Sequence, residues 1–119
     1  MELKRSNTIL YCAAWAATVA FYRDQIGLPI THRNDWFVEF QLGVESFLSV
    51  ADQARATINS SHGAGITLSW QVDDIAAAQR ELQAAGIESS PIKPRWGAQV
   101  LYFHDPEGHR IELWARVNQ

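Results

Sequence analysis

Hydrophobic positions in the first half of the chain follow a clear order of patterns. A short apolar run at residues 7–12 predicts a strand, and apolar side chains at helical spacing over residues 14–25 predict a helix that ends at Gly27. Polar or glycine turn signals then separate three further runs, which predict strands at 28–32, 36–42 and 44–50. The predicted order is therefore one strand, one helix and three strands.

The same order of patterns repeats in the second half of the chain. Residues 67–72 predict a strand, Asp73 and Asp74 can cap the helix predicted at residues 75–85, and Gly86 ends that helix. Three more strands are predicted after it, with a tight turn between the last two at residues 105–108. These strands lie at residues 88–92, 98–104 and 109–115.

A stretch of small and polar residues at 51–65 separates the two halves and predicts a linker, with at most a short helical turn. The pattern therefore predicts an α+β fold of two βαβββ modules, over about residues 7–50 and 66–116. Because neither module can bury both faces of its sheet alone, we expect a single domain. The length of 119 residues is typical of one domain.

Composition narrows the classes of function. The chain is 47% hydrophobic and 19% charged, and no apolar segment approaches the ~20 residues of a membrane helix. We expect no secretory signal, and the lone Cys12, which cannot form an internal disulfide, favours a cytoplasmic protein. A net charge of −3 without a basic stripe argues against nucleic-acid binding. Five tryptophans are many for this length and need an explanation.

Three local motifs span most of the chain. They are Ala20-Phe-Tyr-Arg-Asp24 with Gly27-Leu28, Val72-Asp-Asp74 with Leu82 and Gly86-Ile87, and Phe103-His-Asp-Pro-Glu-Gly-His-Arg-Ile-Glu-Leu113. Together they resemble the vicinal oxygen chelate superfamily, which includes glyoxalase I, bleomycin-resistance proteins, fosfomycin-resistance transferases and extradiol dioxygenases. The resemblance covers about residues 7–115. It implies that each module curls into a cup, that the two cups face each other around a cavity, and that the protein forms a homodimer.

The resemblance also implies where a metal would bind. The metal enzymes of the superfamily use four ligand positions, which correspond here to Asn7, Ser49, Thr67 and Glu112. Only Glu112 is a strong ligand, because divalent transition metals need several imidazole, thiolate or carboxylate donors. We therefore expect no cofactor, with a divalent metal held by Glu112 as the alternative. The three neutral positions argue against glyoxalase, dioxygenase and fosfomycin-transferase activities.

Strand alternation predicts the side chains that line the cups. Four aromatic residues, two carboxylates and one histidine fall on these faces, whereas His32 and His62 fall in turn or linker stretches and His109 follows the turn at 105–108. The predicted ligand-binding residues are Tyr11, Phe37, Glu39, Tyr102, His104, Glu112 and Trp114. Aromatic faces with embedded carboxylates suit a planar or cationic organic ligand, through stacking and cation–π contacts. The alternative is that Arg110 pairs with one of the two carboxylates and that the aromatic side chains only pack.

The other four tryptophans divide into two pairs. Trp15 and Trp70 fall on core positions of the first helix and of the strand at 67–72. Trp36 and Trp96 lie at the starts of strands or loops, where they could line the mouth of a cavity or a dimer contact. Cys12 falls on the core face of its strand, so we do not expect a catalytic thiol.

Three functions are compatible with these residues. The leading hypothesis is a metal-free small-molecule-binding protein, similar to the bleomycin-resistance type, that sequesters a planar or cationic compound such as an antibiotic and thereby confers resistance. The alternative is a lyase- or dioxygenase-type enzyme with a degenerate site centred on Glu112, which would act as metal ligand or general base. The third is a structural or regulatory module that binds a partner chain. The missing metal donors favour a binding protein over an enzyme.

Overall fold

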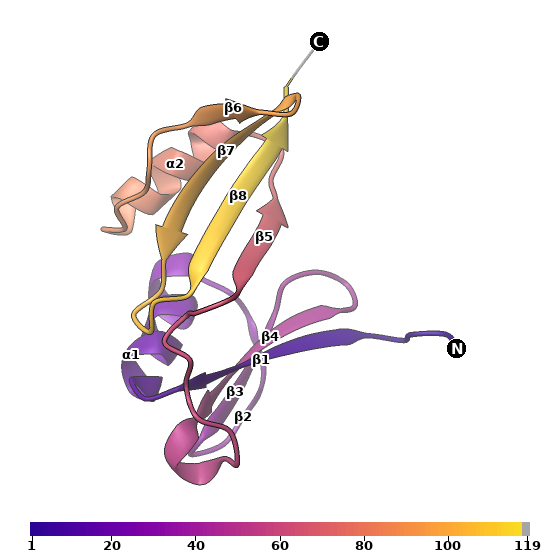
Figure 1. Cartoon of the computed structure of the whole chain (residues 1–119), viewed down its shortest axis with the longest axis vertical. Helices are drawn as coiled ribbons and strands as arrows, with labels where there is room; N and C mark the ends of the chain where they lie inside the picture. Colours follow the sequence, from indigo (N-terminus) through magenta and orange to yellow (C-terminus); the bar gives the residue numbers. More distant parts are fainter. Residues whose placement is uncertain (118–119) are drawn as a thin grey trace. The chain divides into compact units, whose positions relative to one another are not determined.

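The computed structural model describes residues 1–117, which divide into two compact units with the same order of elements (Figure 1). The first unit is Met1–His62, and the second begins at Gly63. Each unit contains one four-stranded sheet with parallel and antiparallel pairs and one main helical segment. The predicted α+β fold of two βαβββ modules is therefore confirmed. Across residues 1–117, every helix is too short or too polar to span a membrane.

The first unit contains four strands in the spatial order β1-β4-β3-β2. Strand β1 pairs in parallel with β4, and the other two pairs are antiparallel. A short 3-10 turn, η2 (Gln53–Arg55), follows the last strand. The elements are β1 (Ser6–Cys12), α1 (Trp15–Ala20), η1 (Phe21–Ile26), β2 (Ile30–Arg33), β3 (Phe37–Gln41) and β4 (Ser46–Asp52).

The helix predicted at residues 14–25 is α-helical only in its first part. It continues from Phe21 as the π-helix η1, in which each residue turns through a smaller angle than in an α-helix. The neighbouring side chains of Phe21 and Tyr22 are both buried there, with ring centroids 5.1 Å apart. The ring of Tyr22 lies 6.0 Å from that of Phe40, so this helical segment packs on one face of the sheet. Cys12 is fully buried, as its predicted core position requires.

The second unit repeats the arrangement with the spatial order β5-β8-β7-β6. Its helix packs against β7 and β8, and the side chain of Asp74 accepts a hydrogen bond from the amide of Ala77 at the start of the helix. The N-cap predicted at this position is therefore confirmed. The elements are β5 (Thr67–Gln71), α2 (Ile75–Ala84), β6 (Lys93–Arg95), β7 (Ala98–His104) and β8 (Arg110–Arg116).

The strand predicted at residues 88–92 is wrong, because the edge strand of this sheet is β6, Lys93–Arg95. Arg95 lies opposite Ala98, so β6 and β7 are joined by a two-residue turn of Trp96 and Gly97. Both turn residues have positive φ, 47° and 76°, as a type I′ hairpin turn requires. The hairpin sets the register of β6. Pro91 lacks the backbone N–H that a longer strand would need.

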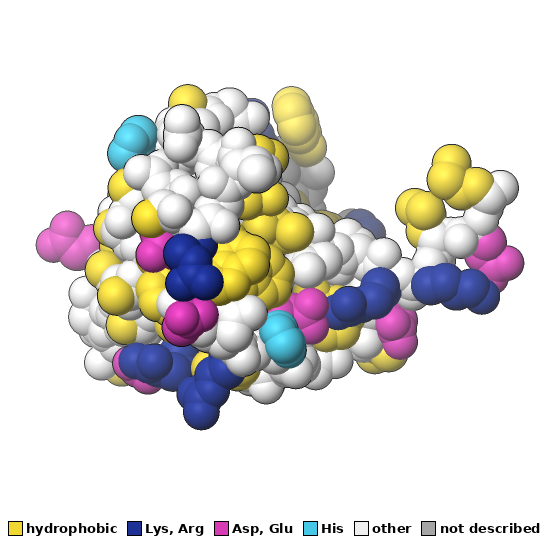
Figure 2. All heavy atoms as spheres, turned by 90° about the horizontal axis from the view of Figure 1, so that it is seen from below, with side chains coloured by type: hydrophobic (Ala, Val, Ile, Leu, Met, Phe, Trp, Pro, Cys, Tyr) yellow, Lys and Arg dark blue, Asp and Glu magenta, His cyan; other side chains and the backbone are white. Residues whose placement is uncertain are grey.

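The surface carries several large exposed hydrophobic side chains, and they are not confined to one element. Leu3, Val44 and Trp96 are 81%, 85% and 92% exposed. In the space-filling view, Lys and Arg side chains lie beside exposed hydrophobic ones (Figure 2). Where an arginine lies over an aromatic ring, its guanidinium is attracted to the ring as a cation–π contact. Four such contacts are formed by Arg5, Arg95, Arg110 and Arg116.

Candidate functional site

The first sheet has one face that does not carry the helix, which we call the first open face. Direct cross-strand partners share a face, and Ile9, Ser49 and Glu39 lie opposite one another on β1, β4 and β3. Tyr11 and Phe37 share this face, since both lie opposite Ala51. The structure thus places three of the predicted ligand-binding residues, Tyr11, Phe37 and Glu39, on this face.

Glu39 is already surrounded by donors on the first open face. The hydroxyl of Thr31 donates a hydrogen bond to Glu39 Oε1 at 2.8 Å, and the guanidinium of Arg5 lies 3.2 Å from the same oxygen. The bond from Thr31 is the main reason that the pKa of Glu39 lies below its ordinary value, with Arg5 adding to it and burial opposing both. The charge of Glu39 therefore has an internal partner, which is Arg5 and not Arg110.

Asn7 and Ser49 are two of the four ligand positions, and they form a hydrogen-bonded group with Glu39. Ser49 is fully buried, and its hydroxyl donates a hydrogen bond of 2.8 Å to the side-chain oxygen of Asn7. The side-chain nitrogen Nδ2 of Asn7 donates to Glu39 Oε2 at 3.4 Å. These three side chains satisfy one another, and the ring of Phe47 beside them carries the guanidinium of Arg5 at 3.8 Å.

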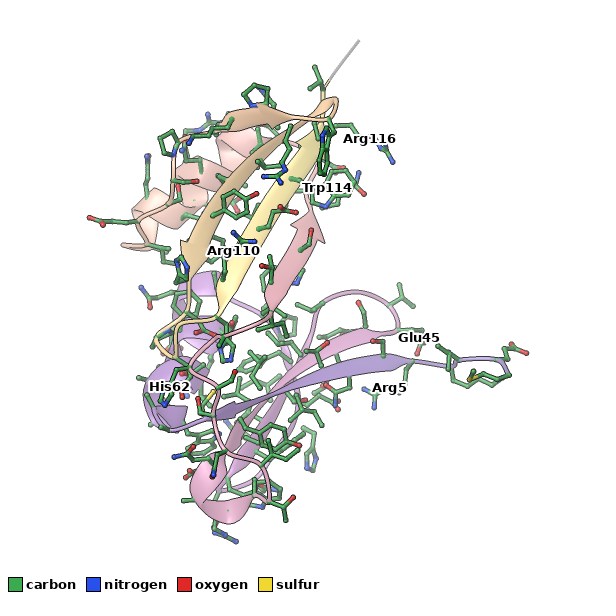
Figure 3. All side chains as sticks on the ribbon, viewed as in Figure 1. Arg5, Glu45, His62, Arg110, Trp114 and Arg116 are labelled. Atoms are coloured by element: carbon green, nitrogen blue, oxygen red, sulfur yellow. The ribbon has the colours of Figure 1, made fainter. Side chains whose placement is uncertain are left out.

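The second sheet has an equivalent face, the second open face, on the side away from α2. The register places Ser69, Glu112 and Tyr102 opposite one another on β5, β8 and β7. The next pairs toward the β6–β7 turn are Trp114 with Val100, then Arg116 with Ala98. The pair His104 and Arg110 lies at the other end, next to Thr67. Figure 3 shows Arg110, Trp114 and Arg116 along β8.

A pocket of about 360 Å³ lies on this second open face. This volume is in the range of small-molecule sites, which span about 300–1,000 Å³. Two of the predicted residues, Glu112 and Trp114, line it together. Tyr102 is not a lining residue, but its hydroxyl accepts a hydrogen bond of 3.2 Å from Nη1 of Arg95, which is one. The lining residues are Ser69, Arg95, Trp96, Ala98, Val100, Glu112 and Trp114.

His104 is exposed, and it is not one of the residues that line the pocket. Five lining residues were not among the predicted set: Ser69, Arg95, Trp96, Ala98 and Val100. Ser69, Ala98 and Val100 lie on strands that were predicted, at 67–72 and 98–104. Arg95 and Trp96 were left in a loop by the wrong strand at 88–92, although Trp96 was a candidate for the mouth of a cavity. The signal that could have found them is the pair Trp96-Gly97 between two extended segments, since a glycine at the second turn position favours a two-residue hairpin.

Charges around the pocket are arranged differently from the sequence interpretation. Glu112 accepts a short hydrogen bond of 2.6 Å from the hydroxyl of Ser69, and within residues 1–117 no lysine or arginine forms an ion pair with it. Arg110 instead donates from Nε to the hydroxyl of Thr67 at 2.9 Å and lies 4.7 Å over the ring of Tyr102. The expected alternative of an Arg110 pair with a carboxylate is therefore wrong.

A second hollow, of about 540 Å³, lies beside the end of α2 and is larger than the pocket. Its lining contains no aromatic side chain and none of the predicted site residues. Glu88 is its one charged lining residue, so it offers little chemistry for recognising a ligand. Its lining residues are Gln79, Gln83, Gly86, Ile87, Glu88, Ser89 and Pro91.

The four ligand positions of the metal enzymes do not fit a transition metal here. Asn7 and Ser49 are hydrogen-bonded to each other, and Thr67 accepts a bond from the cationic guanidinium of Arg110. A cation at this position opposes a second one, and only Glu112 supplies a charged donor. In the part of the chain that the structure describes, no three His, Cys, Asp or Glu side chains gather as a metal site would need.

The one buried acid–histidine pair of the closing hairpin organises a turn. Oδ1 of Asp105 accepts hydrogen bonds from the amides of Glu107 and His109, and Oδ2 lies 2.8 Å from Nδ1 of His109. The side chains of Asp105 and His109 are 0% and 4% exposed. This arrangement holds the predicted 105–108 turn, and Cys12 lies in the core. Trp15 and Trp70, which were both predicted at core positions, are each half-buried, and Trp15 donates from Nε1 to the carbonyl of Val50.

Comparisons with known proteins agree with this architecture. A family model described as the Glyoxalase/Bleomycin resistance protein/Dioxygenase superfamily matches residues 6–113. A glyoxalase/bleomycin resistance protein/dioxygenase from Nocardioides has a similar structure, with a TM-score of 0.81 and 22% identity over 99% of this chain and 86% of that one. Lactoylglutathione lyase from Agrobacterium tumefaciens matches at 0.75 and 22% identity, over 92% and 91% of the two chains.

The antibiotic-binding protein TnmS3 from Streptomyces sp. CB03234 is also similar, with a TM-score of 0.77 and 18% identity over 98% of this chain and 97% of that one. At these identities the structural likeness concerns the fold, and the neighbours include both a binding protein and a lyase. The family model covers nearly the whole chain and both modules. This protein therefore belongs to the glyoxalase/bleomycin resistance protein/dioxygenase superfamily, the vicinal oxygen chelate superfamily that its motifs resemble.

Proposed function

We propose that this protein binds and sequesters a planar aromatic small molecule, such as an antibiotic, without converting it. One observation carries the proposal: two indole side chains, Trp96 and Trp114, line a single pocket of small-molecule size. Flat aromatic side chains bind flat ligands by stacking, with large apolar contact area and little loss of side-chain entropy. A relative of the same fold is an antibiotic-binding protein, which supports this class of function.

The lining of the pocket supports binding and offers few groups for chemistry. Val100 and Ala98 add an apolar floor, and Ser69 and Glu112 supply polar groups that can orient a ligand. The four positions that hold the metal in the enzymes of the superfamily do not fit one here. A sequestering protein needs only affinity, so these replacements leave its function intact.

Ligand binding is tested by titrating the protein with planar aromatic compounds, following the fluorescence of the compound. We expect saturable binding of at least one compound at one site per chain, and a loss of about tenfold or more in affinity for Trp114→Leu. Trp70→Leu is the matched control, because Trp70 lies on the opposite face of the same sheet and partners Leu113. Absence of saturable binding across the panel would overturn the proposal.

A second candidate function rests on Glu112. It is the carboxylate of the pocket, its partner is the neutral hydroxyl of Ser69, and a carboxylate of this kind can serve as a general base in an enzyme. An enzyme would convert a bound compound, and Glu112→Gln would retain binding while abolishing conversion. Recovery of every bound compound unchanged from the wild-type protein would exclude this candidate.

We further propose that the protein is a cytoplasmic homodimer. Each four-stranded sheet ends in edge strands, β1 and β2 in the first and β5 and β6 in the second, and edge strands commonly pair or become covered. Light scattering in dilute buffer should give twice the chain mass of 13.4 kDa. A particle of the single-chain mass throughout the measurable concentration range would contradict the dimer.

A further inference from the structure

Basic side chains are concentrated on the second open face, against the overall composition. The chain has 13 acidic and 10 basic residues, and its net charge is −3. The described strands of the second open face nevertheless present Lys93, Arg95, Arg110 and Arg116 with Glu112 as the one carboxylate among them. Four positive charges less one negative charge leave this face at about +3, so the charge surrounding the pocket favours an anion.

Two of these arginines flank the pocket at the end nearest the β6–β7 turn. Arg95, Ala98 and Arg116 lie opposite one another on β6, β7 and β8, with the alanine in the middle. Neighbouring strands lie about 4.8 Å apart, so the short side chain of Ala98 leaves an open space between two basic residues. Both Arg95 and Ala98 line the pocket.

Aromatic rings hold the guanidinium groups of this face. Arg95 lies 4.9 Å over the ring of Trp96, and Arg116 lies 5.6 Å over that of Trp114. A guanidinium has five N–H donors, and stacking on a ring uses none of them. Arg95 donates to the hydroxyl of Tyr102, while the donors of Arg116 meet no protein acceptor within the residues that the structure describes. These donors remain available to a planar acid, whose carboxylate matches the arginine fork.

We propose that the ligand of this pocket is a planar aromatic anion, held by stacking on Trp96 and Trp114 and by Arg95 and Arg116. This inference rests on the proposed binding function and narrows its ligand class from planar or cationic compounds to aromatic acids. Glu112 lies on the same face with its carboxylate bonded to Ser69, and it would repel an anion placed directly beside it. The acid group is therefore expected at the arginine end, over Ala98.

The test uses three compounds of the same ring size that differ in charge. These are anthracene-9-carboxylate, the neutral 9-anthracenemethanol, and the cationic 9-aminoacridine, each titrated at pH 7 while its own fluorescence is followed. We expect the anion to bind about tenfold more tightly than the neutral compound, and the cation to bind most weakly. Net charge alone would predict the opposite order, because the chain as a whole is acidic.

Substitutions then locate the recognition of charge. Arg95→Gln and Arg116→Gln should each lower the affinity for the anion about five- to tenfold and leave the affinity for the neutral compound unchanged. Binding of the anion to these variants should also depend less on salt concentration. Arg80→Gln is the control, because Arg80 is an exposed residue of α2 on the other side of the sheet. Circular dichroism of each variant verifies that the fold is retained.

The outcomes separate this inference from the proposed function. If the cation binds as tightly as the anion, or if the two arginine variants weaken the neutral compound equally, the anion preference is overturned while aromatic binding stands. If none of the three compounds binds, the proposed function fails together with the inference. Preference for the anion that both arginine variants remove supports it.

Discussion

At the scale of single residues, the two carboxylates predicted on the open faces differ in their partners. Glu39 has three side-chain donors around it, Thr31, Arg5 and Asn7, and its pKa is lowered chiefly by the hydroxyl of Thr31. Glu112 has the hydroxyl of Ser69 as its partner. Glu39 thus stabilises the first unit from within, while Glu112 remains at the wall of a pocket.

The first prediction concerns Thr31→Val. The variant removes the main donor to Glu39, so the pKa of Glu39 should rise toward its ordinary value. A lowered folded-state pKa gives stability that is fully present above the unfolded-state pKa and is lost as pH falls through the folded-state pKa. The free energy of unfolding of the variant should therefore be about 1 kcal/mol lower than that of the wild type at pH 7, and this difference should vanish in acid.

Urea unfolding at pH 7 and in acid, together with an NMR titration of the Glu39 carboxyl carbon, measures both effects. Thr31→Ser is the control, because it keeps the hydroxyl. A pKa of Glu39 that stays the same in Thr31→Val would show that Arg5 and Asn7 hold the carboxylate without help from Thr31.

At the scale of elements, the β6–β7 hairpin determines the pocket. Its turn places Trp96 in a backbone conformation with a φ of 47°. Residues other than glycine, asparagine and aspartate rarely adopt this conformation. Trp96 is also 92% exposed, so burial of its ring does not compensate for this conformation. Strain at an exposed aromatic residue beside a pocket is typical of a side chain retained for binding.

The second prediction follows from that conformation. Trp96→Asn should raise the free energy of unfolding by about 0.5–1 kcal/mol, because asparagine tolerates positive φ better than tryptophan. The same change should lower the affinity for the aromatic probes, since it removes one of the two indoles of the pocket. Thermal unfolding and the fluorescence titration measure the two effects. A variant that binds as tightly as the wild type would remove Trp96 from the binding site.

The third prediction concerns the loop before β5, where Gly63 and Gly65 both have positive φ, +84° and +79°. A Cβ added to Gly63 would lie 2.0 Å from the carbonyl oxygen of Gly108, whereas one added to Gly65 would meet nothing within 4 Å. Gly65→Ala should cost about 1 kcal/mol from its conformation alone. Gly63→Ala should cost at least about 2 kcal/mol more, because a backbone clash adds to the same strain. Equal losses of unfolding free energy for the two variants, measured by urea unfolding, would contradict the close approach of Gly63 to Gly108.

At the scale of the whole molecule, two modules with the same fold carry different chemistry. Each has a helix on one face of its sheet and an open face on the other. On the first open face, the polar side chains of Asn7, Ser49 and Glu39 are hydrogen-bonded to one another. The second keeps a pocket with aromatic walls and surplus positive charge. A repeated fold therefore does not imply a repeated function.

The fourth prediction is that binding does not depend on a metal ion. Treatment with a chelator followed by dialysis should change the affinity for the aromatic probes by less than about twofold, because the proposed contacts are aromatic stacking and hydrogen bonds from arginine, which need no metal ion. Metal analysis of the dialysed protein accompanies the titration. Stoichiometric zinc, nickel, manganese or iron that survives dialysis, with affinity lost on chelation, would contradict the prediction.

Much of the fold could be predicted from sequence because it depends on local rules. Alternation and helical spacing identified β1, β3, β5, β7 and β8 to within a few residues, and Gly27 and Gly86 ended the helical segments as predicted. The π-helical turn at Phe21 and the position of β6 could not be predicted. The first depends on packing two adjacent aromatic rings, and the second on a turn in which a tryptophan takes a positive φ.

The sequence by itself determined the two βαβββ modules, the faces of their strands and the residue types at the metal positions, because periodicity and residue chemistry are properties of the chain. Only the tertiary structure decided which charges meet. Arg5 reaches Glu39 across 34 positions of the chain, and Arg110 turns to Thr67 and Tyr102 instead of a carboxylate. Such pairings depend on sheet register and side-chain rotamers. The same two factors decide that one pocket is lined by Glu112 and Trp114 together with Arg95 and Trp96.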